Sequence, residues 1–345
     1  MVKLPDWRYL IEAEKTDNPS VPIYADLHCD SLNVHLRGQR DITRRSTAGH
    51  LDIPRLLEAG VNVQVFAIWP DPNSLRPGQY QEFVIRAIDT LKEICSRHSD
   101  KLALALSPQE LDRIVASGRI AAIIGVEGGH ALEGRLDRLT DWWERGVRLL
   151  TITWCNSNEL GDSSSDETRP NNGLSRLGRD AVREMNRLGM IVDVSHCAET
   201  TFWHIINVSS APVIASHSGV YALCAHHRNL TDEQIRAIAR KRGLVGMVFL
   251  PGYLRINPAQ ATIADVVSGI SHIIELVGPD SAALGSDFDG FDGRLAGLED
   301  VTMVPKIVLG LQQRRYPLAT IAKVMGANFC RVWREVYQGK LDGSL

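Results

Sequence analysis

The sequence predicts an α/β fold in which eight parallel strands, each followed by a helix, close into a (β/α)8 barrel. Three observations indicate this fold. Apolar runs of strand length alternate eight times with segments of helical periodicity, over about 300 residues. The runs are apolar almost throughout, which is typical of parallel strands buried on both faces. Polar residues follow several of the runs, and the active sites of such barrels form where the strands end.

The predicted elements follow one another in regular order. The predicted strands are residues 23–27, 61–69, 120–126, 147–153, 190–194, 212–215, 244–250 and 282–285. The predicted helices are residues 53–59, 79–97, 107–116, 136–145, 178–188, 198–208, 231–241 and 263–277. Ser107 with Glu110, and Thr231 ahead of Asp232 and Glu233, are typical of helix starts. An open doubly wound sheet is the alternative, but the G-x-G-x-x-G and G-x-x-x-x-G-K-S/T motifs are both missing.

The whole chain, residues 1–345, is expected to form a single domain. Residues 1–20 are polar and are interpreted as an N-terminal extension. Residues 156–175 are rich in Ser, Asp, Asn and Gly and are expected to form a loop over the barrel mouth. Residues 294–345 are expected to form extra C-terminal helices packed on the outside of the barrel. No linker rich in Pro, Gly or Ser indicates a second domain.

Composition and charge exclude several classes of protein. The 345 residues are 44% hydrophobic and carry a formal net charge of -3 without a basic stripe, so nucleic acid is not an expected partner. No segment approaches the ~20 apolar residues of a membrane helix. We therefore expect a cytoplasmic protein with no membrane partner. The six cysteines lack C-x-x-C spacing, and we expect them to be buried small residues rather than disulfides or nucleophiles.

Possible metal ligands and acids follow five of the eight predicted strands. His28 and Asp30 come first, and residues two apart on an extended backbone point the same way. The others are Glu127, His196, His217, Asp287 and Asp289. Each alone fits an ordinary capping or core role. Together they indicate a metal site, because carboxylates left unpaired in an apolar barrel mouth would be costly.

The ligand set is larger than one tetrahedral site requires. Imidazole and carboxylate ligands suit zinc, or a relative such as cobalt or manganese. We therefore predict a two-metal site, with Glu127 as the bridging ligand because it is the only candidate ligand on its strand. Two ions about 3.5–4 Å apart can share a hydroxide that is nucleophilic at neutral pH, so hydrolysis is the predicted chemistry.

Several motifs resemble those of the renal or membrane dipeptidase family, peptidase family M19. They are His-Cys-Asp at 28–30, Gly-Val-Glu-Gly-Gly-His at 125–130, Asp-Val-Ser-His at 193–196, Ser-His-Ser at 216–218, Cys-Ala-His-His-Arg-Asn at 224–229 and Gly-Ser-Asp-Phe-Asp-Gly at 285–290. The resemblance extends from about Tyr24 to Val332. Members of this family are dinuclear zinc peptidases on an amidohydrolase-type barrel, and they are often homodimers.

The resemblance implies a role for each metal ligand. His28 and Asp30 would bind one zinc ion, His196 and His217 would bind the other, and Glu127 would bridge the two.

The resemblance also implies roles in catalysis and substrate binding. Asp287 would be the acid/base that moves a proton from the attacking water to the leaving amine. Arg228 would pair with the free α-carboxylate of a dipeptide, for which the planar guanidinium is suited. Asp289 is placed with the substrate-binding residues.

The sequence departs from the family pattern after the fourth strand. Many members have a histidine there, in a Leu-Thr-His motif, that helps to hold the oxygen of the scissile carbonyl. This chain has Trp154, whose single N–H donor cannot accept or carry a proton. Asn156 or Asn158 could supply a donor instead. His130 and Asn156 are also candidates for supporting the ligands from behind, with ordinary packing as the alternative for His130.

The predicted function is hydrolysis of dipeptides, including those with a D-residue at the C-terminal position, by a dinuclear zinc site. Another amidohydrolase-type reaction is the first alternative, such as deamination or hydrolysis of an N-acyl amino acid, lactam or lactone. Many barrels of that kind bridge their metals with a carboxylated lysine after the fourth strand, where this chain has no lysine. An inactive binding barrel is the second alternative, but it would be expected to have lost ligands.

Overall fold

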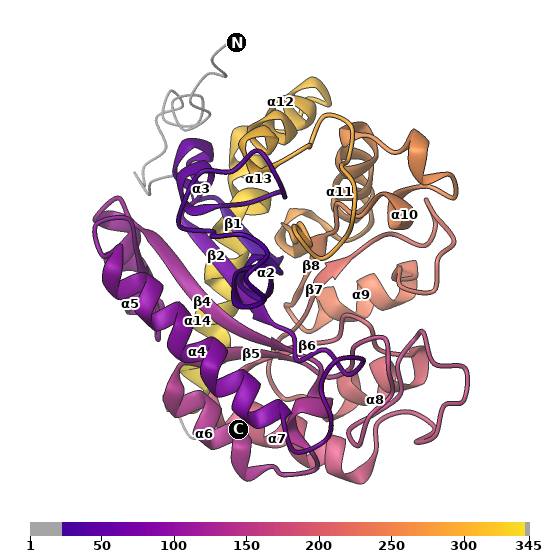
Figure 1. The fold of residues 1–345 in the computed structure, drawn as a ribbon. Coiled ribbons are helices and arrows are strands. Elements are labelled where there is room, and N and C mark those ends of the chain that lie inside the picture. Colours follow the sequence, from indigo (N-terminus) through magenta and orange to yellow (C-terminus); the bar gives the residue numbers. More distant parts are fainter. Residues whose placement is uncertain (1–22, 342–345) are drawn as a thin grey trace.

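The computed structural model describes residues 23–341, so the predicted N-terminal extension at 1–20 and the last four residues lie outside the described part. Parallel strands pair side by side, and pairing of the first with the last closes the barrel (Figure 1). The barrel strands are β1 (Ala25–Cys29), β2 (Val63–Ile68), β4 (Ile120–Glu127), β5 (Val147–Thr151), β6 (Ile191–Asp193), β7 (Val213–Ser218), β8 (Leu244–Met247) and β9 (Ala282–Leu284). The predicted barrel and its eight strands are confirmed.

One strand was not predicted. The short strand β3 (Leu102–Leu104) pairs with the first residues of β4, whereas β5 pairs with the second half of β4. It therefore extends the sheet at the N-terminal end of the barrel without entering the closed ring. Three residues are too few for a period-two pattern to be visible in the sequence.

The predicted helices are also present around the barrel. They are α3 (Ile53–Ala59), α4 (Tyr80–Arg97), α5 (Pro108–Ala116), α6 (Asp137–Arg145), α7 (Arg176–Leu188), α8 (Glu199–Val208), α9 (Asp232–Arg240) and α11 (Ile263–Val277). Side-chain caps explain several starts. Ser107 accepts from the backbone N–H of Glu110 (3.2 Å), and Thr231 forms a capping box with Gln234.

Short additional helices occupy the connections. They are α2 (Ser31–Leu36) and α10 (Pro251–Leu254), with 3-10 turns at Gly129–Leu132, Pro258–Gln260, Pro279–Ser281 and Val301–Met303. In the part of the chain that the structure describes, no helix combines the length and the apolar character needed to cross a membrane.

The C-terminal segment adds α12 (Pro305–Gln313), α13 (Leu318–Ala322), a π-helical turn at Lys323–Ala327, and α14 (Asn328–Leu341). Helix α14 lies across the strand starts, behind the barrel in the view of Figure 1. Phe329 and Trp333 are fully buried in a cluster with Leu27, Val63 and Ile214 from the barrel interior. The helix therefore seals the N-terminal end of the barrel, rather than lying only on its outside. The assignment of the whole chain to one domain stays a prediction.

Candidate metal centre

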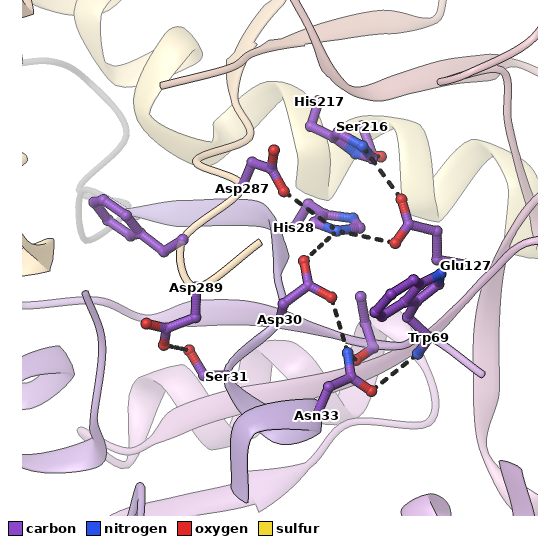
Figure 2. Close-up of polar contacts among 12 residues, drawn as sticks. His28, Asp30, Ser31, Asn33, Trp69, Glu127, Ser216, His217, Asp287 and Asp289 are labelled. Carbon is purple, nitrogen blue, oxygen red and sulfur yellow. Dashed lines mark hydrogen bonds and ion pairs between the residues drawn. The ribbon is translucent and has the colours of Figure 1, made fainter. Parts of the chain in front are cut away.

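Six predicted site residues meet at the opposite, C-terminal end of the strands, and Figure 2 labels all of them except His196. None of the six is more than 7% exposed. They are His28 at the end of β1, Asp30 just before α2, Glu127 at the end of β4, His196 after β6, His217 in β7 and Asp287 after β9.

His28 lies among three carboxylates. Its Nε2 is 3.2 Å from Oδ2 of Asp30, 3.8 Å from Oε2 of Glu127 and 3.9 Å from Oδ1 of Asp287. The side chains of His28, Asp30 and Asp287 form a group whose possible ligand atoms all lie within 4.8 Å of one another. His28, Glu127 and His217 form a second such group.

The two carboxylate oxygens of Glu127 face different sides of the centre. Oε2 faces His28, whereas Oε1 is 3.0 Å from Nε2 of His196 and 3.4 Å from Nε2 of His217. The carboxylate of Glu127 thus contacts His28 on the β1 side and both His196 and His217 on the β6 and β7 side. This is the arrangement that a bridging ligand requires.

A buried relay fixes the orientation of His217. Two backbone N–H groups and two hydroxyl groups donate to the carboxylate of Asp193, including the hydroxyl of Ser216 at 2.6 Å. Because that hydroxyl donates to Asp193, its oxygen is left to accept from Nδ1 of His217 (2.8 Å). Nε2 of His217 therefore presents a lone pair to the centre, as a metal-binding imidazole does.

Lone pairs converge in this centre. Nε2 of His217 lies 3.4 Å from the acceptor Oε1 of Glu127 and 3.0 Å from Nε2 of His196. Two facing acceptors repel each other unless a proton or a cation lies between them. The donor set, with three imidazoles and at least two carboxylates, fits divalent metal ions such as zinc.

Burial dominates the electrostatics of the centre. It raises the pKa of Glu127 and of Asp287, and the nearby carboxylate of Asp30 raises both further against the opposing effect of His28. Burial also lowers the pKa of His28, but Glu127, Asp30 and Asp287 outweigh it and raise that pKa to about 10. The buried carboxylates therefore favour a positive charge at the position of His28, and metal ions bound there would provide it.

The histidines of the other pair behave differently. Burial, together with Arg228 and His28, lowers the pKa of His196 and of His217 well below the ordinary value. Both rings are thus held neutral, the form in which imidazole binds a metal.

Two of the site residues have an unusual backbone conformation. His196 and Asp287 have φ values of 68° and 61°, in the left-handed region that residues other than glycine rarely adopt. Such strain is found preferentially at functional sites. A Cβ atom on Gly290 would lie 2.2 Å from Oδ1 of Asp287 and 2.5 Å from Oδ2 of Asp30, so glycine is needed beside these carboxylates.

A cavity of about 400 Å³ opens onto the centre. Arg228 and Trp154 both line it, together with Glu127, His196 and Asp287. The cavity has the size of a small-molecule site.

Arg228 is held at one side of this cavity. It is buried, its Nη2 donates to the backbone oxygen of His217 (3.3 Å), and its guanidinium lies 5.4 Å from the ring centre of Tyr253. Its Nε has no hydrogen-bond partner among the described residues. The sequence alone, without the family resemblance, gave no reason to expect this buried position.

Asp289 also lines the cavity, but its carboxylate is bound by other residues of the protein. Its carboxylate accepts from the hydroxyl of Ser31, the guanidinium of Arg40 and the backbone N–H of His50 (2.8 Å), and it lies apart from the cluster in Figure 2. These contacts favour a role in tying the loop after β9 to the loops after β1. A part in substrate binding stays a prediction.

The weaker candidates lie behind the site. Nε2 of His130 is 2.8 Å from the backbone oxygen of Pro70, and its ring packs edge-on against Tyr80 at 5.2 Å, which favours the packing alternative. Asn158 donates to the backbone oxygen of Ile152 (2.9 Å), within its own loop. The Oδ1 of Asn156 is buried without a partner among the described residues, and its predicted roles stay predictions.

Several residues that shape the site were not predicted from the sequence. Asn33 donates to Oδ1 of Asp30 (2.8 Å) and accepts from the backbone N–H of Trp69 (3.0 Å). Trp69 was counted only as the end of a strand, although its side chain lines the cavity. Asp193 and Ser216 belong to the quoted motifs, and their places directly after or beside strand ends were the available signal.

Comparison with known proteins identifies the family. The model of the membrane dipeptidase family, peptidase family M19, matches residues 20–342. Dipeptidase tcpJ of Claviceps purpurea is 34% identical over 338 residues, which cover 96% of this chain and 75% of the fungal protein. Dipeptidase aclJ of Aspergillus oryzae is 34% identical over 84% of this chain and 70% of its own length.

Solved structures agree as well. A metallopeptidase from Rhodobacter sphaeroides, crystallised with a phosphinate mimic of the dipeptide L-Ala-D-Ala, superposes with a TM-score of 0.84 at 26% identity, covering 91% of this chain and 99% of its own. The structure of a family M19 metallopeptidase described as dipeptidase AC has the same TM-score at 27% identity and covers 92% and 99%. The chain is a metal-dependent hydrolase of the dipeptidase type, and it belongs to the membrane dipeptidase family, peptidase family M19.

Proposed function

We propose that this protein hydrolyses dipeptides with a dinuclear zinc centre held by His28, Asp30, Glu127, His196 and His217. The observation that carries the proposal is the position of Glu127. One of its carboxylate oxygens faces His28, and the other faces His196 and His217. His28 and Asp30 would hold one ion, and His196 and His217 the other. When bound, such a pair of ions polarises a carbonyl group and makes a water molecule nucleophilic at neutral pH.

Asp287 is the proposed proton carrier. Its carboxylate lines the cavity, and no described residue donates a hydrogen bond to it, in contrast to the carboxylates of Asp30 and Asp289. A carboxylate that accepts no hydrogen bond from the protein can accept a proton from the attacking water and deliver it to the leaving amine. Asp287 also belongs to a group of possible metal ligands with His28 and Asp30, and metal analysis of an Asp287 variant separates the role of ligand from that of proton carrier.

Arg228 is the proposed anchor for the substrate. A dipeptide has a free α-carboxylate directly beyond the scissile bond, and a guanidinium binds a carboxylate through two parallel hydrogen bonds. Arg228 contacts the backbone of His217, so a carboxylate bound there would lie beside the metal centre. Substrates without a free carboxylate would lose this contact.

The L-Ala-D-Ala mimic in the Rhodobacter relative supports a substrate of dipeptide size and suggests that D-residues are accepted at the C-terminal position. Trp154 lines the cavity in place of the histidine found in many family members. We therefore expect the scissile carbonyl to be held without an imidazole from this position. The zinc identity, the cytoplasmic location and the homodimer are part of the same proposal.

A dipeptide panel tests the function. The purified protein would be stripped of metal, loaded with zinc, and assayed on L-Ala-L-Ala, L-Ala-D-Ala, L-Ala-L-Ala amide and N-acetyl-L-alanine. We expect cleavage of both free dipeptides, weak cleavage of the amide and none of the N-acyl amino acid. Absence of dipeptide cleavage by metal-loaded protein would overturn the proposal, and selective cleavage of N-acetyl-L-alanine would favour the amidohydrolase alternative.

A further inference from the structure

We propose that Trp69 and Trp154 form a subsite that selects a large aromatic side chain on the N-terminal residue of the dipeptide. The inference rests on the proposed function and adds the class of substrate to it. It concerns two residues of this chain, one of which stands where many family members have a histidine.

The two indoles form one wall of the cavity. Their ring centres are 4.7 Å apart with the planes inclined at 47°, and both side chains line the cavity. Neither is fully buried, so each leaves ring area accessible to a ligand. Aromatic rings on a cavity wall offer flat apolar area to a ligand at small cost in side-chain entropy.

A series of contacts links Arg228 to the wall through the metal centre. Arg228 contacts the backbone of His217, whose ring is 5.1 Å from that of His196. The ring of His196 is 6.4 Å from that of Trp154, which in turn contacts Trp69. In the proposed binding mode the carboxylate of the dipeptide lies on Arg228, the peptide bond lies over the centre, and the N-terminal side chain contacts the indoles, which line the same cavity.

The wall is attached to the metal centre itself. Oδ1 of Asn33 accepts from the backbone N–H of Trp69 (3.0 Å), and Nδ2 of the same side chain donates to Asp30 (2.8 Å), as Figure 2 shows. On the other side, the hydroxyl of Ser163 donates to the backbone oxygen of Trp154. The backbone at both tryptophans is thus held in position before a ligand arrives, which reduces the entropy lost on binding.

Arg37 supports the outer part of the wall. Its guanidinium lies 4.9 Å from the ring centre of Trp69, and its Nη2 is 3.7 Å from a carboxylate oxygen of Asp71. This contact limits the movement of the Trp69 ring and places a positive charge near it. The subsite therefore suits neutral aromatic side chains better than those of lysine or arginine.

The test compares paired substrates that differ only in the first side chain. Steady-state kinetics on L-Trp-L-Ala, L-Phe-L-Ala, L-Lys-L-Ala and L-Ala-L-Ala would give the ratio of kcat/KM for aromatic over alanyl substrate. We expect that ratio to exceed one by about tenfold or more in the parent protein, the scale of discrimination that an apolar pocket provides. The lysyl substrate should fall below both aromatic substrates.

Two variants each remove one of the two indoles of the wall. Trp154→Leu and Trp69→Leu should each lower the aromatic-to-alanyl ratio by about tenfold, mainly through KM for the aromatic substrates. Trp203→Leu, on helix α8 and outside the cavity lining, is the matched control and should leave the ratio unchanged. Having two variants keeps the test decisive if one of them does not fold.

The outcomes separate this inference from the proposed function. If the parent cleaves L-Ala-L-Ala but shows no aromatic preference, or if both variants lower all substrates equally, the subsite is overturned while the dipeptidase function stands. If metal-loaded parent protein cleaves none of the dipeptides, the proposed function fails first.

Discussion

The two ends of the barrel are built in opposite ways. At the N-terminal end, α14 places Phe329 and Trp333 against apolar strand residues. At the C-terminal end, histidines and carboxylates are buried together, and His196 and Asp287 adopt left-handed backbone conformations. One end gains stability from the burial of apolar area, whereas the other concentrates charge and strain.

This difference indicates that stability and function depend on opposite ends of the barrel. Charges as closely packed as those around Glu127 would destabilise the fold if they had no partner, so the C-terminal end is explained by metal ions and substrate. The apolar N-terminal end supplies stability that such a site requires. Substitutions at the two ends should therefore affect different measurements.

Glu127→Gln should have the largest effect on activity. The amide keeps the shape of the side chain but removes the negative charge and one of the two ligand oxygens that face the histidine groups. We expect peptidase activity at the background level and fewer metal ions per chain by elemental analysis. Glu144→Gln on the exposed face of α6 is the matched control, and a Glu127→Gln protein with two ions and full turnover would exclude the bridging role.

Asp287→Asn should have the second-largest effect on activity. Loss of the proton carrier should lower kcat by roughly 10²–10⁴-fold, while both metal ions are retained. Metal analysis and kcat are measured on the same preparation. Turnover equal to that of the parent would show that Asp287 carries no proton in the rate-limiting step, and loss of metal would identify it as a ligand.

Arg228→Ala should raise KM for free dipeptides by about 10–100-fold, because a buried charge-assisted contact to the carboxylate is lost. The same substitution should have much less effect on a dipeptide amide, which has no carboxylate. Arg228→Lys serves as the charge-conserving comparison. An unchanged KM for the free dipeptide would place the carboxylate elsewhere.

Trp333→Ala should have the smallest effect on turnover and a large one on stability. Removing this fully buried side chain at the sealed end should lower the free energy of unfolding by about 3–5 kcal/mol. Urea denaturation measures the loss, and kcat/KM of the folded protein should stay close to the parent value. A strong loss of kcat/KM in folded protein would mean that the two ends are coupled.

The repeating part of the fold was predictable from the sequence. The eight barrel strands are mostly apolar, and the helices between them have caps such as Ser107 and Thr231 that local chemistry determines. The position of α14 was not predictable, because the apolar spacing of Phe329 and Trp333 shows that the helix has a buried face but not which surface covers it.

The candidate site was likewise only partly predictable from the sequence. Strand-end positions were sufficient to suggest His28, Asp30 and Glu127, because the ends of parallel strands meet at one end of a barrel. The contacts of Asp193 with Ser216, and of Trp69 with Trp154, join residues far apart in the sequence. Such contacts depend on strand register and side-chain direction, which no local pattern contains.

The most direct test of the two-metal centre is a zinc titration of metal-free protein. Hydrolysis of L-Ala-L-Ala would be followed as zinc is added, with bound metal measured by elemental analysis at each point. Two groups of ligands joined by Glu127 predict that activity saturates at about two zinc ions per chain. Full activity with one ion per chain, or in the metal-free protein, would contradict the account.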